Sequence, residues 1–160
     1  MAISPGSDLT LLLLAGFRSL ADAAQAELAA RGYEDVRPAN AFAIRAIAAG
    51  ADTASELGRS LTVSKQAAAK TIAVLQQRGY VALAVDPNDA RRKPLQVTDH
   101  GFSMLRESEV IFDELRAQWA KQIGADKLED MEAHLAELTG SAPLRFDTPG
   151  WVARGLGGPA

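Results

Sequence analysis

The chain has 160 residues, 48% of them hydrophobic and 23% charged, which is typical of one globular domain with or without an oligomerisation extension. It contains no cysteine, which excludes disulfides, thiolate metal sites and cysteine nucleophiles. The apolar run from Leu11 to Leu14 is too short to span a membrane, and no Lys or Arg precedes it as in a signal peptide. We therefore expect a cytoplasmic protein.

The net charge is −3, but it is unevenly distributed. Residues 59–93 hold seven Lys or Arg side chains and two Asp, a net of +5, so the remainder of the chain carries −8. A basic segment on an acidic body is the asymmetry expected where one face meets phosphate, although such a cluster also fits an ordinary solvated surface.

Apolar residues recur at helical spacing over 7–31, where Ser7 or Asp8 can cap a helix and Gly32 can end it. A connector at 33–39 follows. Asn40 is then a suitable cap for a second helix over 41–49, which ends at Gly50.

Thr53 precedes a short helix at 54–61, and Glu56 completes a capping-box pattern. Thr62 and Val63 form a tight connection, after which Ser64 can cap a helix over 65–78. The inward face of that helix is predicted to consist of Ala68, Ile72 and Leu75.

The apolar residues then change from helical spacing to alternation with other residues. This predicts a β-hairpin with strands at 80–85 and 93–97 around the turn-rich segment 86–92. Val81, Leu83 and Val85 would share one face of the first strand. Pro94 falls inside the second strand, where a residue without an N–H belongs at an edge.

Thr98 can cap a long helix over 99–122, Gly124 interrupts it, and a last helix is predicted over 126–139. The fold class is therefore mainly α with a small β-hairpin wing. We expect a winged helix-turn-helix lobe at 36–98, a helical dimerisation lobe formed by 7–34 and 99–140, and a C-terminal tail at 141–160.

Helix, tight turn, helix and hairpin in this order make up a winged helix-turn-helix, whose second helix fits the major groove of DNA. The first turns of that helix must present short polar or basic side chains, and Gln can pair with adenine while Lys can reach guanine or phosphate. The same segment also fits a helical hairpin whose polar side chains are merely solvated. The candidate DNA-binding side chains of this helix are Ser64, Lys65, Gln66, Lys70 and Thr71.

The predicted hairpin tip carries the adjacent cations Arg91, Arg92 and Lys93 on a loop that cannot bury them. An arginine on such a tip can enter an A·T-rich minor groove, where the negative potential is strongest. Asp89, two residues before Arg91, can hold that guanidinium at a fixed angle. A surface ion pair of little energetic value is the simpler alternative.

Residues 53–101 resemble the DNA-binding lobe of the MarR family of bacterial and archaeal regulators. The wing segment Asp86-Pro87-Asn88-Asp89-Ala90-Arg91, followed by Leu95-Gln96-Val97-Thr98 and Gly101, is similar to that family's wing signature. The resemblance implies that Arg91 enters the minor groove, that Asp89 orients it, and that the flanking helices form the dimer. Pro94 and the tail beyond Gly140 depart from the family's pattern.

Two further expectations concern partners. The apolar stripes of the terminal helices, which include Leu9, Leu12 and Leu138, favour a homodimer, although they could also pack within one chain. The resemblance implies a crevice between the lobes for a small aromatic or phenolic effector, and Arg18, Arg45 and Trp119 are candidates to line it.

The sequence offers no catalytic constellation and implies no cofactor or metal, because His100 and His134 have no ligand partner at helical spacing; surface or capping roles are expected for both. We therefore predict a sequence-specific regulator that binds double-stranded DNA, a repressor acting as a homodimer on a palindromic operator. The alternatives are a winged-helix module that binds protein instead of DNA and, less favoured, the dimerisation domain of an enzyme such as a methyltransferase.

Overall fold

The computed structural model describes residues 4–140; the predicted tail at 141–160 lies outside the described residues. This part of the chain contains helices and one two-stranded antiparallel sheet, which confirms the predicted fold class. None of its helices is long and apolar enough to cross a membrane. The elements are α1 (Pro5–Ala30), α2 (Pro38–Ala48), α3 (Ala54–Leu61), α4 (Lys65–Gln77), β1 (Val81–Leu83), β2 (Leu95–Val97), α5 (Asp99–Ile123) and α6 (Ala125–Thr139).

Three helices begin at the hydroxyl caps that the sequence predicts. The side chains of Thr53, Ser64 and Thr98 accept hydrogen bonds from backbone N–H groups three residues later, at 3.2, 3.1 and 3.1 Å. These caps fix the beginnings of α3, α4 and α5, so the start of each helix is set by its own local sequence.

The beginning of α2 was predicted wrongly. The helix starts at Pro38 rather than at residue 41, because proline has no N–H to satisfy and its φ is already helical. Asn40 therefore lies in the first turn and caps nothing; its side-chain amide donates to the carbonyl oxygen of Asp35 at 2.6 Å.

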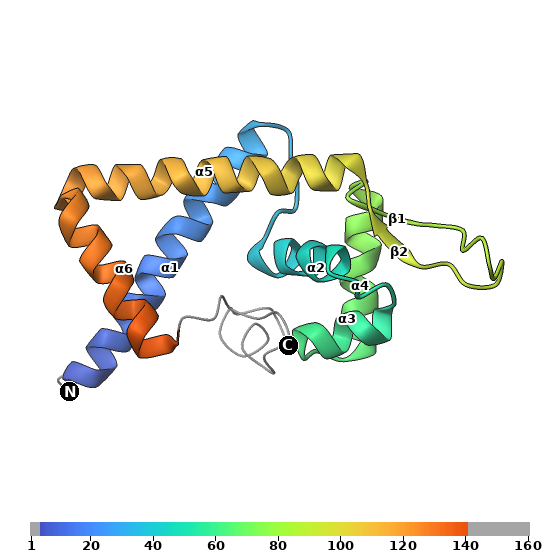
Figure 1. Cartoon of the computed structure of the whole chain (residues 1–160), viewed down its shortest axis with the longest axis horizontal. Coiled ribbons are helices and arrows are strands. Elements are labelled where there is room, and N and C mark those ends of the chain that lie inside the picture. The colour runs from blue at the N-terminus through green and yellow to red at the C-terminus, as the bar shows by residue number, and fades with distance from the viewer. Residues whose placement is uncertain (1–3, 141–160) are drawn as a thin grey trace.

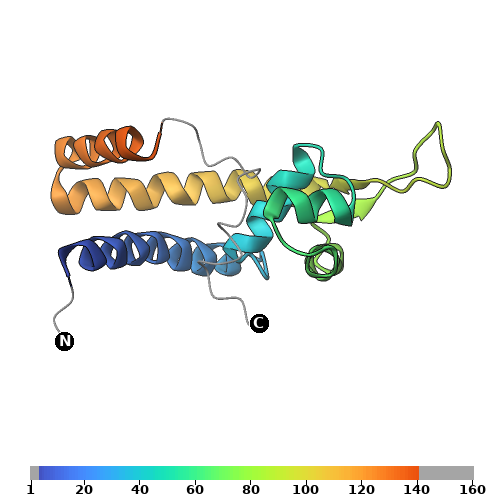
Figure 2. The ribbon, with the colours of Figure 1, turned by 90° about the horizontal axis from the view of Figure 1, so that it is seen from below.

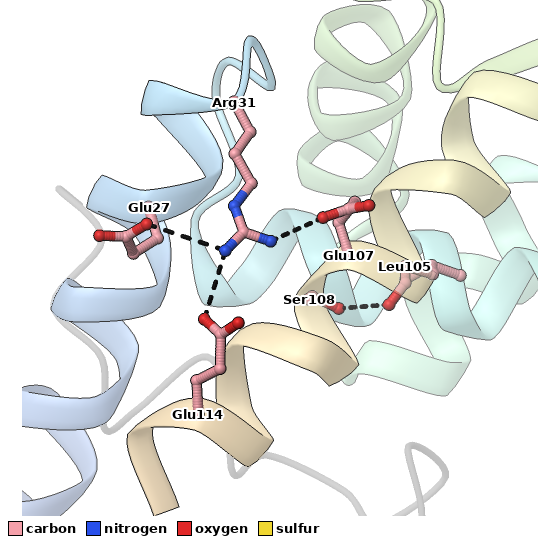
Figure 3. A network of polar contacts seen from close by, with 6 residues as sticks. All are labelled: Glu27, Arg31, Leu105, Glu107, Ser108 and Glu114. Carbon is pink, nitrogen blue, oxygen red and sulfur yellow. Dashed lines mark hydrogen bonds and ion pairs between the residues drawn. The ribbon is translucent and has the colours of Figure 1, made fainter. Parts of the chain in front are cut away.

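The helical lobe consists of α1, α5 and α6. In Figure 2, α1 and α6 lie on opposite sides of α5. Arg31, at the end of α1, joins α1 to α5 through Glu107 at 2.7 Å and Glu114 at 3.3 Å, as Figure 3 shows. Arg116 binds both carboxylate oxygens of Glu132 at 2.7 Å and so joins α5 to α6.

The second lobe comprises α2, α3, α4 and the hairpin, at one end of α5 (Figure 1). Its largest fully buried side chains are Tyr80, Ile44, Leu57 and Leu75. Ala68, Ile72 and Leu75 form the inward face of α4, as predicted. Leu95 on β2 belongs to the same core and is 6% exposed. This core holds α4 and the base of the hairpin in one rigid unit.

The hairpin forms the wing, with Val81 opposite Val97 and Leu83 opposite Leu95. Val81 is buried, but Leu83 and Val85 are 52% and 75% exposed, which differs from the predicted apolar face. The reason is that the wing projects beyond the body of the lobe, as Figure 2 shows, so its outer part has no core to cover it. β2 begins one residue after Pro94, whose carbonyl accepts from the N–H of Ala84 at 2.8 Å.

The beginning of α5 passes very close to the end of the α4–β1 connection. The N–H and hydroxyl of Thr98 donate to the carbonyls of Tyr80 and Gly79, at 3.0 and 2.5 Å. A Cβ atom on the buried Gly101 would overlap the carbonyl oxygen of Tyr80 and lie 2.7 Å from Cγ1 of Val97. Only glycine fits this position, which joins the two lobes.

Gly101→Ala is therefore expected to destabilise the fold by about 2 kcal/mol or more, because backbone must move to make room for the methyl group. Urea unfolding followed by circular dichroism measures this change. Gly16→Ala is the matched control, since its Cβ would meet only the Trp119 ring at 3.6 Å. If Gly101→Ala were as stable as that control, the close approach would not constrain the fold.

Candidate nucleic-acid interface

The turn between α3 and α4 is tight because the backbone closes on itself there. Thr62 adopts a left-handed conformation with φ of 53°, and the N–H of Val63 donates to the carbonyl of Gly58 at 2.9 Å. A Cβ on Gly58 would lie 3.0 Å from the carbonyl oxygen of Val63. The turn therefore sets the angle at which α4 leaves α3, and with it the direction in which α4 presents its outer face.

The outer face of α4 is polar and basic. Lys65, Gln66 and Lys70 are exposed, and Thr71 is half-buried beside them. Within residues 4–140 no carboxylate forms an ion pair with either lysine. Ser64 caps the helix as an acceptor, which leaves its hydroxyl hydrogen available to donate. This face thus offers hydrogen-bond donors and unneutralised charge to solvent.

The three cations predicted at the wing tip are all exposed, but their surroundings differ. In the described part of the chain, Arg91 and Lys93 have no ion-pair partner. Arg92 instead lies 2.6 Å from a carboxylate oxygen of Asp52 and 3.6 Å from one of Asp86. Two of the three cations are therefore available to an external anion, and the third is already engaged.

Asp89 acts on the backbone of the wing tip. Its Oδ1 accepts from the N–H of Arg91 at 3.0 Å, and Oδ1 of Asp86 accepts in the same way from the N–H of Asn88 at 2.8 Å. These local bonds shape the loop as two successive Asx turns. We expected Asp89 to hold the guanidinium of Arg91; the contact that the structure shows holds the backbone of Arg91 instead.

The end of α4 is fixed to the connector before α2. Arg78 pairs with Glu34 and with Asp35, the latter at 2.5 Å from its Nε. The hydrogen bond to Asp35 raises the already high pKa of Arg78, so this guanidinium keeps its charge at any pH at which the protein is folded. Arg78 therefore stabilises the fold by joining α4 to the connector before α2, and its charge is already paired within the chain.

Aromatic rings pack at the same junction. The His100 ring stacks on Tyr80, with centroids 5.0 Å apart, and on Tyr33, with centroids 5.2 Å apart. The Tyr80 hydroxyl donates to the carbonyl of Glu34 at 2.7 Å, and burial raises its pKa to about 12. His100 is exposed at the surface, as predicted, but its stacking between two tyrosines was not foreseen.

A cavity of about 170 Å³ lies where α1, α2 and α5 meet. Arg45 is part of its wall, as expected, and pairs with Glu109 of α5. The other two predicted wall residues, Arg18 and Trp119, are not part of it; the Trp119 ring lies against Gly16 instead. The wall is mainly apolar and comprises Phe17, Ala21, Ala24, Gln25, Leu28, Val36, Pro38, Ala41, Phe42, Arg45, Ser108 and Phe112.

Three features of the site were not predicted from the sequence: the pairing of Arg92 with Asp52, the aromatic stack on His100, and the phenylalanines of the cavity. Each joins residues far apart in the chain, so no local pattern could have indicated it. Among residues 4–140 no group of three or more His, Asp or Glu side chains is placed to hold a metal ion.

Comparison with known proteins links part of the chain to a family. Residues 34–92 match the profile described as MarR family. The chain is similar in structure to YusO from Bacillus subtilis, with 21% identity, 88% of this chain and 100% of that chain covered, and a TM-score of 0.64. No curated protein sequence matches the chain significantly.

Two other solved structures are similar to a comparable degree. The S. aureus MepR–DNA complex is 20% identical over 84% of this chain and 98% of that chain, with a TM-score of 0.62. Apo MarR from E. coli is 20% identical over 86% of this chain and 98% of that chain, with a TM-score of 0.61. At these identities the likeness shows a common fold.

Proposed function

We propose that this chain, whose residues 34–92 match the MarR family profile, is a transcription regulator that binds double-stranded DNA in a sequence-specific manner and is not an enzyme. The observation that carries the proposal is the set of exposed, unpaired cations on two neighbouring elements, α4 and the wing. A solved relative, MepR, forms a complex with DNA, which supports the same use of the fold here.

In this proposal α4 lies in the major groove and the wing reaches the adjacent minor groove. Gln66 can form a bidentate pair with adenine, and Lys65 and Lys70 can reach guanine or phosphate. Ser64 and Thr71 donate to nearby phosphates or base edges. Arg91 enters the minor groove, and Asp89 orients it through the backbone bond of the wing turn.

The proposed regulator acts as a homodimer. The leucines at the N-terminal half of α1 stay exposed in a single chain: Leu9 is 59% and Leu12 62% exposed, and Leu138 at the end of α6 is 82% exposed. An apolar surface of this kind is expected to be covered by a partner. Two-fold symmetry would then place two α4 helices about 34–36 Å apart on a palindromic operator.

We further propose that the regulator represses its genes and that a small aromatic effector releases it from DNA by entering the cavity between α1, α2 and α5. Three phenylalanines, Phe17, Phe42 and Phe112, contribute to the wall. An apolar cavity of about 150 Å³ in another protein is large enough for benzene, so 170 Å³ suits a single ring. The effector would separate α1 from α2 and α5 and so turn the winged lobe, together with α5, relative to α1.

Arg91→Ala is expected to weaken DNA binding by at least about tenfold, which is about 1.4 kcal/mol, because the wing loses its minor-groove contact. Fluorescence anisotropy with the intergenic DNA upstream of the protein's own gene measures the affinity. Lys121→Ala is the control: it removes one exposed positive charge from the end of α5 opposite the wing (Figure 1) and should leave affinity unchanged.

Unchanged affinity of Arg91→Ala at physiological salt would refute its role in the wing. A wild-type protein that binds none of that DNA, but retains a protein partner through the same surface, would instead favour the alternative of a protein-interaction module.

The dimer is tested by light scattering of the free protein, which should give about twice the chain mass of 16.9 kDa. Leu12→Glu should lower the mass to that of one chain, because it places a charge in the proposed interface. Leu83→Glu, on the wing, where the leucine is 52% exposed, is the control and should leave the dimer intact. A wild-type monomer would refute both the dimer and the palindromic operator.

The effector proposal is tested by a thermal-shift series of aromatic acids and phenols, read together with release of DNA. A ligand at 100 times its Kd should raise Tm by about 5–10 °C and weaken DNA binding. Ala21→Leu, which places extra methyl groups in the cavity, should abolish both effects while the free variant still binds DNA. A ligand that acts equally on this variant would bind elsewhere, and no response at all would argue against an effector in this cavity.

A further inference from the structure

Asp52, in the turn between α2 and α3, contacts the wing at two points. Its carbonyl oxygen accepts from the N–H of Leu95 on β2 at 2.9 Å. Its carboxylate Oδ2 accepts from Nη2 of Arg92 at 2.6 Å. Nη1 of the same guanidinium lies 3.6 Å from Oδ2 of Asp86, which follows β1. Arg92 therefore links both sides of the wing to the helix-turn-helix.

The burial of the two carboxylates explains why Arg92 stays where it is. The side chains of Asp52 and Asp86 are only 21% and 18% exposed, whereas that of Arg92 is 53% exposed. Oδ1 of Asp52 is buried with no hydrogen-bond partner among the described residues. If Arg92 left for a phosphate, two partly buried carboxylates would lose the counter-charge that they share, which is costly.

We propose that Arg92 is a positioning residue that fixes the wing relative to α3 and α4, and not a DNA contact as its sequence neighbourhood suggests. This inference rests on the proposed DNA binding. Asp52 and Asp86 hold the guanidinium on the body side of the wing, so that its neighbours Arg91 and Lys93, which lack ion-pair partners in the described part, remain available to DNA.

The two roles predict opposite responses to Asp52→Asn, a change of charge at nearly constant shape. A positioning Arg92 needs the carboxylate, so Asp52→Asn should weaken DNA binding by about fivefold to tenfold. A phosphate-binding Arg92 would be released by the same substitution, and affinity would stay the same or rise. Arg92→Gln should weaken binding in either case. Combined with Asp52→Asn, however, it should add little further loss if the two residues act through one contact.

The salt dependence of DNA affinity separates the roles a second time. Loss of one phosphate contact lowers the slope of log K against log salt by about 0.9. Arg92→Gln should therefore leave the slope of the wild-type protein unchanged, and Lys93→Gln, which removes an unpaired cation next to it, should lower it. Arg92→Lys keeps the charge but cannot bridge two carboxylates in the same way. A positioning role therefore predicts that its DNA affinity lies between those of Arg92→Gln and the wild-type protein.

A measurement without DNA makes the inference independent of the proposed function. Hydrogen exchange of the Leu95 amide, which bonds to Asp52, should be about tenfold faster in Asp52→Asn and in Arg92→Gln, and unchanged in Lys93→Gln. Unaltered exchange in the first two variants would overturn the positioning role, as would a lower salt slope in Arg92→Gln. If the exchange rates change as expected but the wild-type protein binds no DNA, the proposed function fails and the wing attachment stands.

Discussion

The close approach of α5 to the end of α4 is the constraint on which the arrangement of the two lobes depends. The carbonyls of Tyr80 and Gly79 accept hydrogen bonds from Thr98. The backbone segments are so close there that residue 101 has no space for a side chain. The chain enters the wing and leaves it at this one point. The directions of α4, of the wing and of α5 are therefore fixed together, and none of the three can turn alone without breaking buried contacts.

This coupling gives the cavity its significance. α5 links the helical lobe to the winged lobe. Met104 and Ile111 pack in the common core, while Arg31 and Arg116 join α5 to α1 and α6. The Arg45–Glu109 pair joins α2 to α5 beside the cavity. Because α5 is coupled to the winged lobe, a molecule that widened the cavity would turn both together relative to α1. Two such lobes in a dimer would then change the spacing of their α4 helices.

Local sequence was sufficient to predict most of the fold. Hydroxyl caps at Thr53, Ser64 and Thr98 and the apolar spacing of α4 act over a few residues, and the structure shows each as predicted. One error was local: Pro38, two residues before Asn40, begins α2 because proline suits the first position of a helix. The other arose from a missing neighbour, since Leu83 is exposed because the body of the lobe does not reach it. The cavity wall joins three helices, so only the folded chain assembles it.

The adjacent arginines of the wing show most clearly what sequence patterns leave undetermined. Arg91 and Arg92 have the same side chain, the same loop and exposed positions, and a motif treats both as cations at a tip. What separates them is the direction that each takes from the turn shaped by Asp89 and Asp86. Arg92 meets a half-buried carboxylate 40 residues earlier in the chain, and Arg91 meets no carboxylate in the described part. In the proposed complex with DNA, a flexible wing would lose conformational entropy on binding. Attachment of the wing at Arg92 shifts that entropy loss to folding, so that it does not reduce the affinity for DNA.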